Sequence, residues 1–338
     1  MSRRLGAQTV ELTNPVCVAA GAAVVGKKEG EGPLRERFDE IGTDAYFGQK
    51  SWEKAESVML SRCFQKLCAK AKTPPEQIQY LLAGDLQSQC TASAFAVRGS
   101  AVPFLGLYGA CSTMGEGMSL GAMLIDGGAA ETVCAMTSSH FCAAEREFRL
   151  PLEYGGQRTP SAQWTATAAG AVLLRAGGGG ARITHITTGK IVDAGVTDAS
   201  NMGAAMAPAA WETLKAHFAE TGRAPGDYDA VITGDLGHFG HDILADLAAA
   251  EGVVFPVAFT DCGMLIYNAE HQDVHAGGSG CGCCASVFAG HILKCMQEGL
   301  WRKVLFAPTG ALMSLVTSQQ GESIPGICHA LALEWKEE

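Results

Sequence analysis

Short apolar runs alternate with glycine-terminated helical segments along most of the chain. The runs at 78–86 (IQYLLAGDL), 130–140 (AETVCAMTSSH) and 167–176 (TAAGAVLLRA) are rich in Val, Leu and Ala and predict buried strands. The segments 117–128 (GMSLGAMLIDGG) and 289–299 (AGHILKCMQEG) predict helices that end at glycine. This alternation favours an α/β protein with buried sheets over an all-β or an all-helical protein.

The second half of the chain repeats the pattern of the first. The run at 78–86 recurs as 228–236 (YDAVITGDL), which places Asp85 and Asp235 at equivalent positions. In the same way, 130–140 corresponds to 301–314 and 167–176 to 325–335. We therefore predict two pseudo-symmetric α/β halves, residues 1–180 and 181–338, joined at the flexible glycines 177–180.

Composition narrows the class of protein. Of the 338 residues, 47% are hydrophobic and 18% charged, which allows a large core and disfavours long disordered segments. A net charge of −10 without a basic tract argues against nucleic-acid binding. Although there are 13 cysteines, neither a signal-peptide core nor an apolar run long enough to span a membrane is visible. We expect reduced thiols and a protein on the cytoplasmic side of a membrane.

The segment 103–126 (PFLGLYGACSTMGEGMSLGAMLID) carries the strongest chemical signal. A strand is predicted to end at Cys111, and a helix of small residues to begin directly after it. The backbone N–H groups and the dipole at a helix N-terminus favour a thiolate, so the pattern predicts a lowered pKa for Cys111. This thiolate would serve either as a nucleophile for acyl transfer or in the recognition of an anion.

Several motifs resemble known families. The GACST turn, the DGG after the following helix, the duplicated half and the late GGSG loop resemble the thiolase superfamily, which includes the ketoacyl synthases. More narrowly, the chain is similar to the stage V sporulation protein AD (SpoVAD) family over nearly its full length; the motifs include GPL at 32–34, GQKSWEKAE at 48–56, PLEYGGQ at 151–157 and MGAAMAPAA at 202–210. This resemblance implies a thiolase-like five-layer α-β-α-β-α fold and a homodimer. It also implies a role in sporulation and germination: binding of dipicolinic acid (pyridine-2,6-dicarboxylate) for uptake into the developing spore, together with the SpoVA membrane proteins.

The resemblance also defines what an enzyme would need at this site. A condensing enzyme of the superfamily uses its cysteine with a His and a second His or Asn. Here Gly234 and Asp235 stand near the first position and Gly278 and Ser279 near the second, and neither replacement can act as the same base. An acyltransferase, or a β-ketoacyl synthase III-like or thiolase-like enzyme acting on acyl-CoA or acyl carrier protein, remains the alternative, with Cys111 and His140 as its catalytic residues. His238 and His241 lie close to the altered motif and would serve only in a shifted register.

A planar dianion requires donors for two carboxylates and a flat slot for its ring. For free dipicolinate the predicted set is Cys111, Ser112, Ser138, Ser139, His140, Gly277, Gly278, Ser279 and Gly280, with one cation from Arg146, Arg149 or Lys50. A calcium complex would instead recruit Asp85, Asp235 or Asp261. Both forms of the ligand stay open, although such aspartates more often cap turns.

The spacing of the late cysteines and the search for membrane-binding motifs decide what the sequence predicts about metal and membrane contacts. Cys281, Cys283 and Cys284 occur near Cys262, His271 and His275, but C-x-C-C is not a usual zinc spacing, so no metal and no cofactor are predicted. The sequence shows no lipidation motif and no basic amphipathic helix. We expect a protein partner to hold the chain at the spore inner membrane as a peripheral protein.

Overall fold

A computed structural model describes residues 2–148, 157–255 and 258–337. Ten strands follow one another across the main sheet, and their order is symmetric about its middle. From one edge to the other they are β11 (Phe259–Asp261), β10 (Ala230–Gly234), β13 (Lys303–Ala311), β15 (Ala330–Lys336), β9 (Gly180–Thr187), β2 (Thr9–Val25), β8 (Ala168–Ala176), β6 (Thr132–Ser139), β4 (Tyr80–Gly84) and β5 (Phe104–Gly106). Three short strands are attached to this path: β1 (Arg3–Arg4), β3 (Glu40–Ile41) and β14 (Gly326–Cys328).

The repeated motifs occupy equivalent strands. β4 lies in parallel between β6 and β5, just as β10 lies in parallel between β13 and β11. The long strand β2 pairs with β8 along residues 16–25 and with β9 along residues 9–18, and so joins the two halves of the sheet. Each half therefore has five main strands in a matching order.

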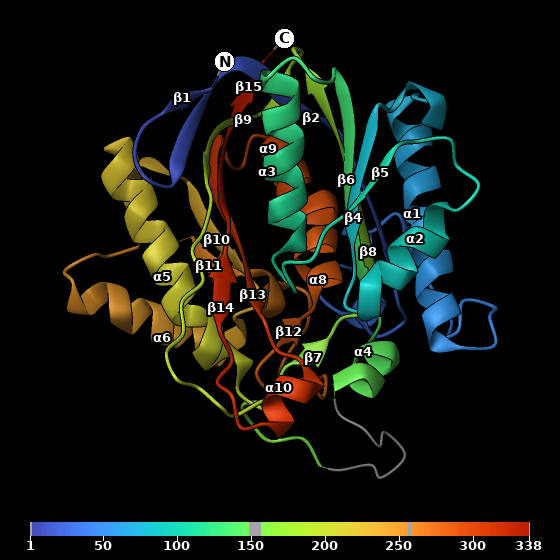
Figure 1. Ribbon diagram of the computed structural model, residues 1–338, viewed down its shortest axis with the longest axis vertical. Helices are drawn as coiled ribbons and strands as arrows, with labels where there is room; N and C mark the ends of the chain where they lie inside the picture. The colour runs from blue at the N-terminus through green and yellow to red at the C-terminus, as the bar shows by residue number, and fades with distance from the viewer. Residues whose placement is uncertain (1, 149–156, 256–257, 338) are drawn as a thin grey trace.

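Helices cover both halves and fill the space between them (Figure 1). The helices α3 (Thr113–Asp126) and α8 (Cys281–Val287) lie in the middle, with α9 (Leu293–Gln297) continuing from α8. On one outer face are α1 (Trp52–Ala71) and α2 (Thr91–Val97), and on the other α5 (Met202–Thr221) and α6 (Gly237–Ala250). The shorter elements α4 (Phe141–Phe148), β7 (Trp164–Thr165), β12 (Gly278–Ser279) and α10 (Leu315–Gln319) lie near one end of the sheets. The short helix α7 (Cys262–Leu265) follows β11.

The alternation of apolar side chains along the strands explains these layers. In β4, Leu81 packs in the cluster under α1, whereas Leu82 packs in the central cluster with α3. In β10, Val231 packs under α5 and Ile232 faces the centre. Since successive strand residues point to opposite faces, strands with no polar face must be covered on both sides.

The five-layer α-β-α-β-α arrangement predicted from the sequence is present, with helices on both outer faces and between the two halves of the sheet (Figure 1). The central cluster contains side chains from both halves, so the two halves share one core. The proposed division near residue 180 stays a prediction, with Gly180 as the first residue of β9. The strand before Cys111 is shorter than predicted, because β5 ends at Gly106. No helix in the described ranges is long and apolar enough to cross a membrane.

Candidate functional site

Cys111 stands in a tight turn where the two halves meet. Ala110 has a φ of +49°, and α3 begins at Thr113. Gly310 of β13 packs directly against this turn, since a Cβ there would lie 2.4 Å from the carbonyl oxygen of Gly109. The turn therefore depends on a close backbone approach that only glycine permits.

The Cys111 thiol is buried. Its side chain is 6% exposed and packs with Leu86, Ala144 and Cys281. Burial raises the pKa of Cys111 well above its ordinary value, and the nearby Asp235 carboxyl raises it further, while the backbone N–H of Gly280 has a smaller lowering effect. The expected lowering of this pKa is wrong, because loss of hydration outweighs the helix N-terminus.

Asp235 does not provide the missing base. It follows β10 with a φ of +74° and is fully buried, and no N–H or O–H group of the described residues donates to its carboxyl oxygens. Burial and the neighbouring Asp261 raise the pKa of Asp235 well above its ordinary value, which favours the protonated acid. A protonated acid cannot accept the Cys111 proton. His241, which the sequence offered as a base in a shifted register, stacks on the ring of Phe259, with ring centroids 4.2 Å apart.

We therefore expect Cys111 to resist alkylation in the native protein. Iodoacetamide should modify the partly exposed Cys142 at least about tenfold faster than Cys111, because a buried thiol with a raised pKa provides little thiolate. Mass spectrometry of peptides after timed labelling measures both rates. Labelling of the urea-unfolded chain is the control and should remove the difference, whereas rapid native labelling of Cys111 would contradict this picture.

The predicted serines use their hydroxyl protons within the protein. Ser112 donates to the carbonyl of Gly109 at 2.7 Å and Ser139 to that of Ala166 at 2.7 Å. Ser138 donates to the Glu56 carboxyl at 3.0 Å. All three side chains are fully buried, so these hydroxyls are already engaged.

The glycine-rich loop is held mainly by backbone pairing. Gly278 and Ser279 form β12, which runs parallel to β7. The N–H of Trp164 donates to the carbonyl of Gly277 at 2.8 Å. From this loop the N–H of Gly280 reaches the Cys111 sulfur, and the side chain that packs on Cys111 is that of Cys281. A residue further along this loop, Cys281, thus packs directly on Cys111.

Two of the predicted calcium ligands cap turns, as the sequence suggested. Asp85 accepts hydrogen bonds from the backbone N–H groups of Gln87 and Ser93 and from the Ser93 hydroxyl. Asp261 accepts from the Thr233 hydroxyl and from three backbone N–H groups. Within the described ranges, no group of three or more His, Cys, Asp or Glu side chains is arranged to hold a metal ion.

The predicted cations lie outside the Cys111 turn. Arg146 forms an ion pair with Glu53 at 3.0 Å and lies 4.6 Å from the ring centroid of Trp52. Lys50 is exposed. Arg149 lies outside the described residues. The structure therefore does not bring Arg146 or Lys50 together with Cys111.

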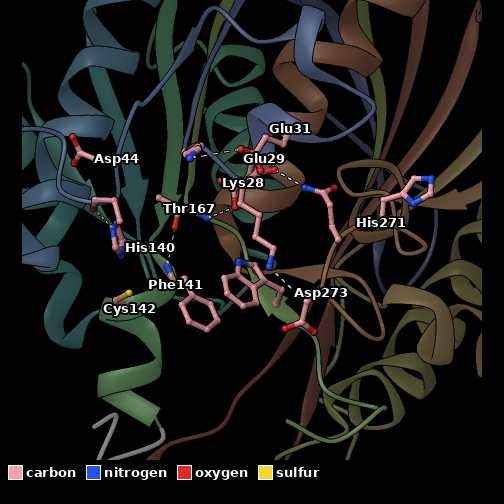
Figure 2. A pocket seen from close by; sticks show the side chains of 15 residues that line it. Lys28, Glu29, Glu31, Asp44, His140, Phe141, Cys142, Thr167, His271 and Asp273 are labelled. Atoms are coloured by element: carbon pink, nitrogen blue, oxygen red, sulfur yellow. Dashed lines mark hydrogen bonds and ion pairs between the residues drawn. The ribbon is translucent and has the colours of Figure 1, made fainter. Parts of the chain in front are cut away.

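A separate pocket of about 490 Å³ combines aromatic and charged side chains (Figure 2). It lies beside the start of α4 and is lined by Gly26, Lys27, Lys28, Glu29, Glu31, Asp44, Ala45, His140, Phe141, Cys142, Trp164, Thr167, His271, Gln272 and Asp273. His140 therefore lines this pocket. Its Nε2 donates to the carbonyl of Ala45 at 2.7 Å, while Nδ1 has no partner among the described residues. Burial lowers the pKa of His140, which keeps the ring neutral.

Trp164 is the centre of this second pocket. Phe141 stacks against its ring, with centroids 3.6 Å apart and planes within 7°. The Lys28 ammonium lies 3.4 Å from the Trp164 ring centroid and donates to the carbonyl of Asp273 at 2.8 Å. The Arg158 guanidinium lies 4.8 Å from the same ring centroid. The pocket thus offers aromatic surface and the Lys28 ammonium, and the Arg158 guanidinium, which forms an ion pair with Asp273 at 2.7 Å, lies over the same ring; aromatic surface with nearby cations suits an aromatic anion.

Sequence reasoning missed Lys28, Trp164 and Arg158. The available signals were weak: a lysine pair directly after the long strand β2, and a tryptophan within a run of small residues. Neither is a motif, and the three residues come from separate segments that only the fold brings together.

Comparison with known proteins places the chain in a family. The model of the family described as stage V sporulation protein AD (SpoVAD) matches residues 6–334. The chain belongs to the stage V sporulation protein AD family. A protein named stage V sporulation protein AD, from Bacillus subtilis (strain 168), is 41% identical over 329 residues, which cover 97% of each chain. The chain is therefore a sporulation protein of the SpoVAD family.

Solved structures with low sequence identity share its fold. A 3-oxoacyl-[acyl-carrier-protein] synthase III from Aquifex aeolicus VF5 matches with a TM-score of 0.58 and 12% identity, covering 95% of this chain and all of the other. A His-to-Asp variant of OleA from Xanthomonas campestris matches with a TM-score of 0.60 and 14% identity, covering 96% of this chain and all of the other. At this identity the likeness concerns the fold alone.

Proposed function

We propose that this SpoVAD family member binds free dipicolinate for its uptake into the developing spore. The observation that supports this function best is the Trp164 pocket, where Lys28 and Arg158 lie over an aromatic ring. Dipicolinate is a flat ring with two carboxylates. Aromatic surface can take up its ring, and an ammonium and a guanidinium can each bind a carboxylate.

The surroundings of Cys111 support the choice of this pocket over the predicted turn. The buried ionisable groups near Cys111 and its neighbour Cys281 include the carboxyls of Asp235, Asp85 and Glu56. Burial raises the pKa of Glu56 to about 8. A dianion there would face buried acids and lose hydration without a compensating cation. The same burial leaves Cys111 without the activation that acyl transfer requires.

The free dianion is the form of the ligand that we propose. Asp85 and Asp261, which a calcium complex would recruit, already accept hydrogen bonds from the turns that they cap. The cations at Trp164 favour carboxylates that are not neutralised by a metal. Calcium should therefore weaken binding by withdrawing free ligand.

Calorimetry with dipicolinate tests the function. We expect saturable binding by the wild-type protein, and a loss of about tenfold to a hundredfold in affinity for Lys28→Met, because a hydrogen bond to a charged group contributes about 1.5–3 kcal/mol. Trp164→Leu should weaken binding as well. Lys54→Met is the matched control, since Lys54 is exposed, lies outside the lining of the pocket, and its loss changes the net charge equally. Absence of binding by the wild-type protein, with or without calcium, would reject the function.

We propose that other SpoVA membrane proteins hold the chain as a peripheral protein at the spore inner membrane, where dipicolinate is delivered.

We also propose a homodimer that pairs through β5, which is an edge strand of the main sheet. Its Phe104 and Leu105 are 36% and 46% exposed, and such an apolar edge is a template for a second strand.

A further inference from the structure

Glu29 is a buried carboxyl in the wall of the Trp164 pocket. It lies in the short helical turn Glu29–Glu31 after β2 and is 1% exposed. Figure 2 shows it beside Lys28 and Thr167. A buried acid normally satisfies both oxygens, since an unpaired one costs free energy. In Glu29 only one of them has a partner in the part of the chain that the structure describes.

The hydrogen bonds of Glu29 indicate where its proton resides. Oε1 accepts from the Tyr267 hydroxyl and from the backbone N–H of Thr167, the latter at 3.0 Å. Oε2 is buried and has no partner among the described residues. In the neutral acid the proton lies on Oε2, because Oε1 already accepts two hydrogen bonds.

The electrostatic environment agrees with a neutral acid. Burial raises the pKa of Glu29, while the Tyr267 hydroxyl, the backbone N–H groups of Glu29 itself and of Thr167, and the Lys28 charge lower it by less. Burial and the adjacent Glu29 also raise the pKa of Tyr267 well above its ordinary value, so its O–H persists. Apart from Tyr267 and Lys28, the ionisable groups around the pocket are Lys27, Glu31, Asp44, His140, Cys142, Arg158, His271 and Asp273.

We propose that Glu29 recognises a carboxylate of the pocket's ligand by donating a hydrogen bond from its protonated Oε2, in addition to the cations Lys28 and Arg158. This inference rests on the proposed function and names a further recognition residue for it. Hydrogen bonds from an acid to a carboxylate are short and strong, because the acceptor is charged. A ligand with two carboxylates can use both the cations and Glu29, whereas a ligand with one carboxylate can use only one of them.

The dependence of affinity on pH tests this role. A deprotonated Glu29 loses its donor and repels the ligand, so wild-type affinity for dipicolinate should fall about tenfold per pH unit above the pKa of Glu29. Glu29→Gln should bind with little dependence on pH, because Tyr267 and Thr167 still donate to its carbonyl oxygen and its NH₂ group replaces the Oε2 hydroxyl. Calorimetry from about pH 6 to about pH 9.5 measures both profiles.

Three further measurements make the test specific. Glu31→Gln is the matched control, since it removes a carboxylate from the same pocket and should keep the wild-type pH profile. Tyr267→Phe removes a hydrogen bond that lowers the pKa of Glu29, so the loss of dipicolinate affinity in this variant should begin at higher pH than in the wild type.

Picolinate, which has one carboxylate, should bind the wild-type protein more weakly than dipicolinate does. The Glu29→Ala substitution should also weaken picolinate binding less than it weakens dipicolinate binding. Thermal unfolding of each variant verifies that it is folded.

The outcomes separate this inference from the proposed function. If the wild-type protein binds dipicolinate but its affinity does not change with pH, the role of Glu29 is wrong and the function stands. If Glu29→Gln loses affinity with pH as the wild type does, the titrating group is Lys28, whose pKa burial also lowers, and the inference is equally wrong. If the wild-type protein does not bind dipicolinate at any pH, the function itself fails.

Discussion

Acidification from about pH 7.5 to about pH 4.5 is expected to lower the free energy of unfolding by about 2–3 kcal/mol through His217 alone. Burial, together with the charges of His185 and Arg223, lowers the pKa of His217 from 6.5 to about 3. Below pH 6.5 the unfolded chain therefore binds a proton that the folded protein resists. Stability from this residue is complete above its unfolded pKa and is lost as the pH falls toward the folded value.

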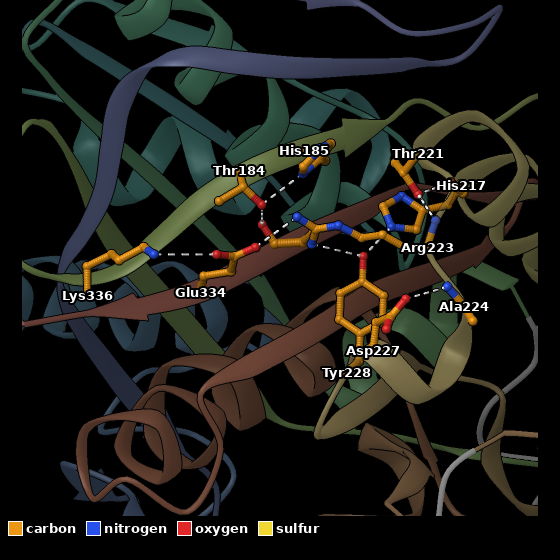
Figure 3. A network of polar contacts seen from close by, with 11 residues as sticks. Thr184, His185, His217, Thr221, Arg223, Ala224, Asp227, Tyr228, Glu334 and Lys336 are labelled. Atoms are coloured by element: carbon orange, nitrogen blue, oxygen red, sulfur yellow. Dashed lines mark hydrogen bonds and ion pairs between the residues drawn. The ribbon is translucent and has the colours of Figure 1, made fainter.

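The neutral state of His217 is part of a polar network (Figure 3). Its Nδ1 lies 2.8 Å from the Thr187 hydroxyl and its Nε2 lies 2.6 Å from the Tyr228 hydroxyl. Arg223 donates to the same Tyr228 oxygen at 3.4 Å and forms an ion pair with Glu334 at 2.9 Å. A proton added to His217 would place a second positive charge near Arg223 in a buried site.

Urea unfolding followed by circular dichroism at several pH values measures this effect. His217→Gln removes the titrating group and should reduce the slope of stability against pH below about pH 6.5. Part of the slope should remain, because burial lowers the pKa of His329 to about 4. His271→Gln is the control, since His271 is exposed. An unchanged slope in His217→Gln would contradict the assignment.

The fold could be predicted because its signals are local and repeated. The runs at 78–86 and 228–236 became β4 and β10, and each stands at the same place in its half of the sheet. Apolar strands without a polar face require cover on both sides, which already implies several layers. The bounds of the strand before Cys111 were less certain, because residues 107–112 are apolar and small but turn toward α3.

The burial and the raised pKa of the Cys111 thiol could not be predicted in the same way. A cysteine before a helix is a local signal and suggests a reactive thiol. Its burial is not local, since Leu86, Ala144 and Cys281 reach it from three separate segments. The carboxyl of Asp235 reaches it from the other half. Desolvation by distant residues thus reverses the inference that was drawn from the turn.

The Trp164 pocket also could not be predicted from local sequence signals. Lys28 follows β2, Phe141 begins α4, Trp164 lies in β7 and Asp273 precedes β12. No spacing in the sequence connects them, and a lysine shortly after a strand is ordinarily a solvated residue. His140 was expected to face a site at the end of its strand, and the pocket that it lines is formed largely by residues that the sequence did not single out.

The close approach of β8 to α8 predicts a large effect of a single added methyl group. In Gly170→Ala, the new Cβ would lie 2.2 Å from the backbone carbon and 2.3 Å from the carbonyl oxygen of Ala285. These atoms belong to the backbone of α8, so no side-chain rotation relieves the overlap. Overpacking of this kind typically costs 1–3 kcal/mol, and we expect a loss of about 3 kcal/mol in the free energy of unfolding.

Gly226→Ala is the matched control for this substitution. Gly226 has an ordinary φ, and nothing lies within 4 Å of its added Cβ, so its stability should change by less than about 0.5 kcal/mol. Urea unfolding at neutral pH compares the two variants. Because α8 lies in the central layer and carries Cys281 against Cys111, the shift in Gly170→Ala should also expose that thiol and speed its alkylation. A Gly170→Ala protein as stable as Gly226→Ala would show that the sheet and α8 can move apart freely, contrary to a core shared by both halves.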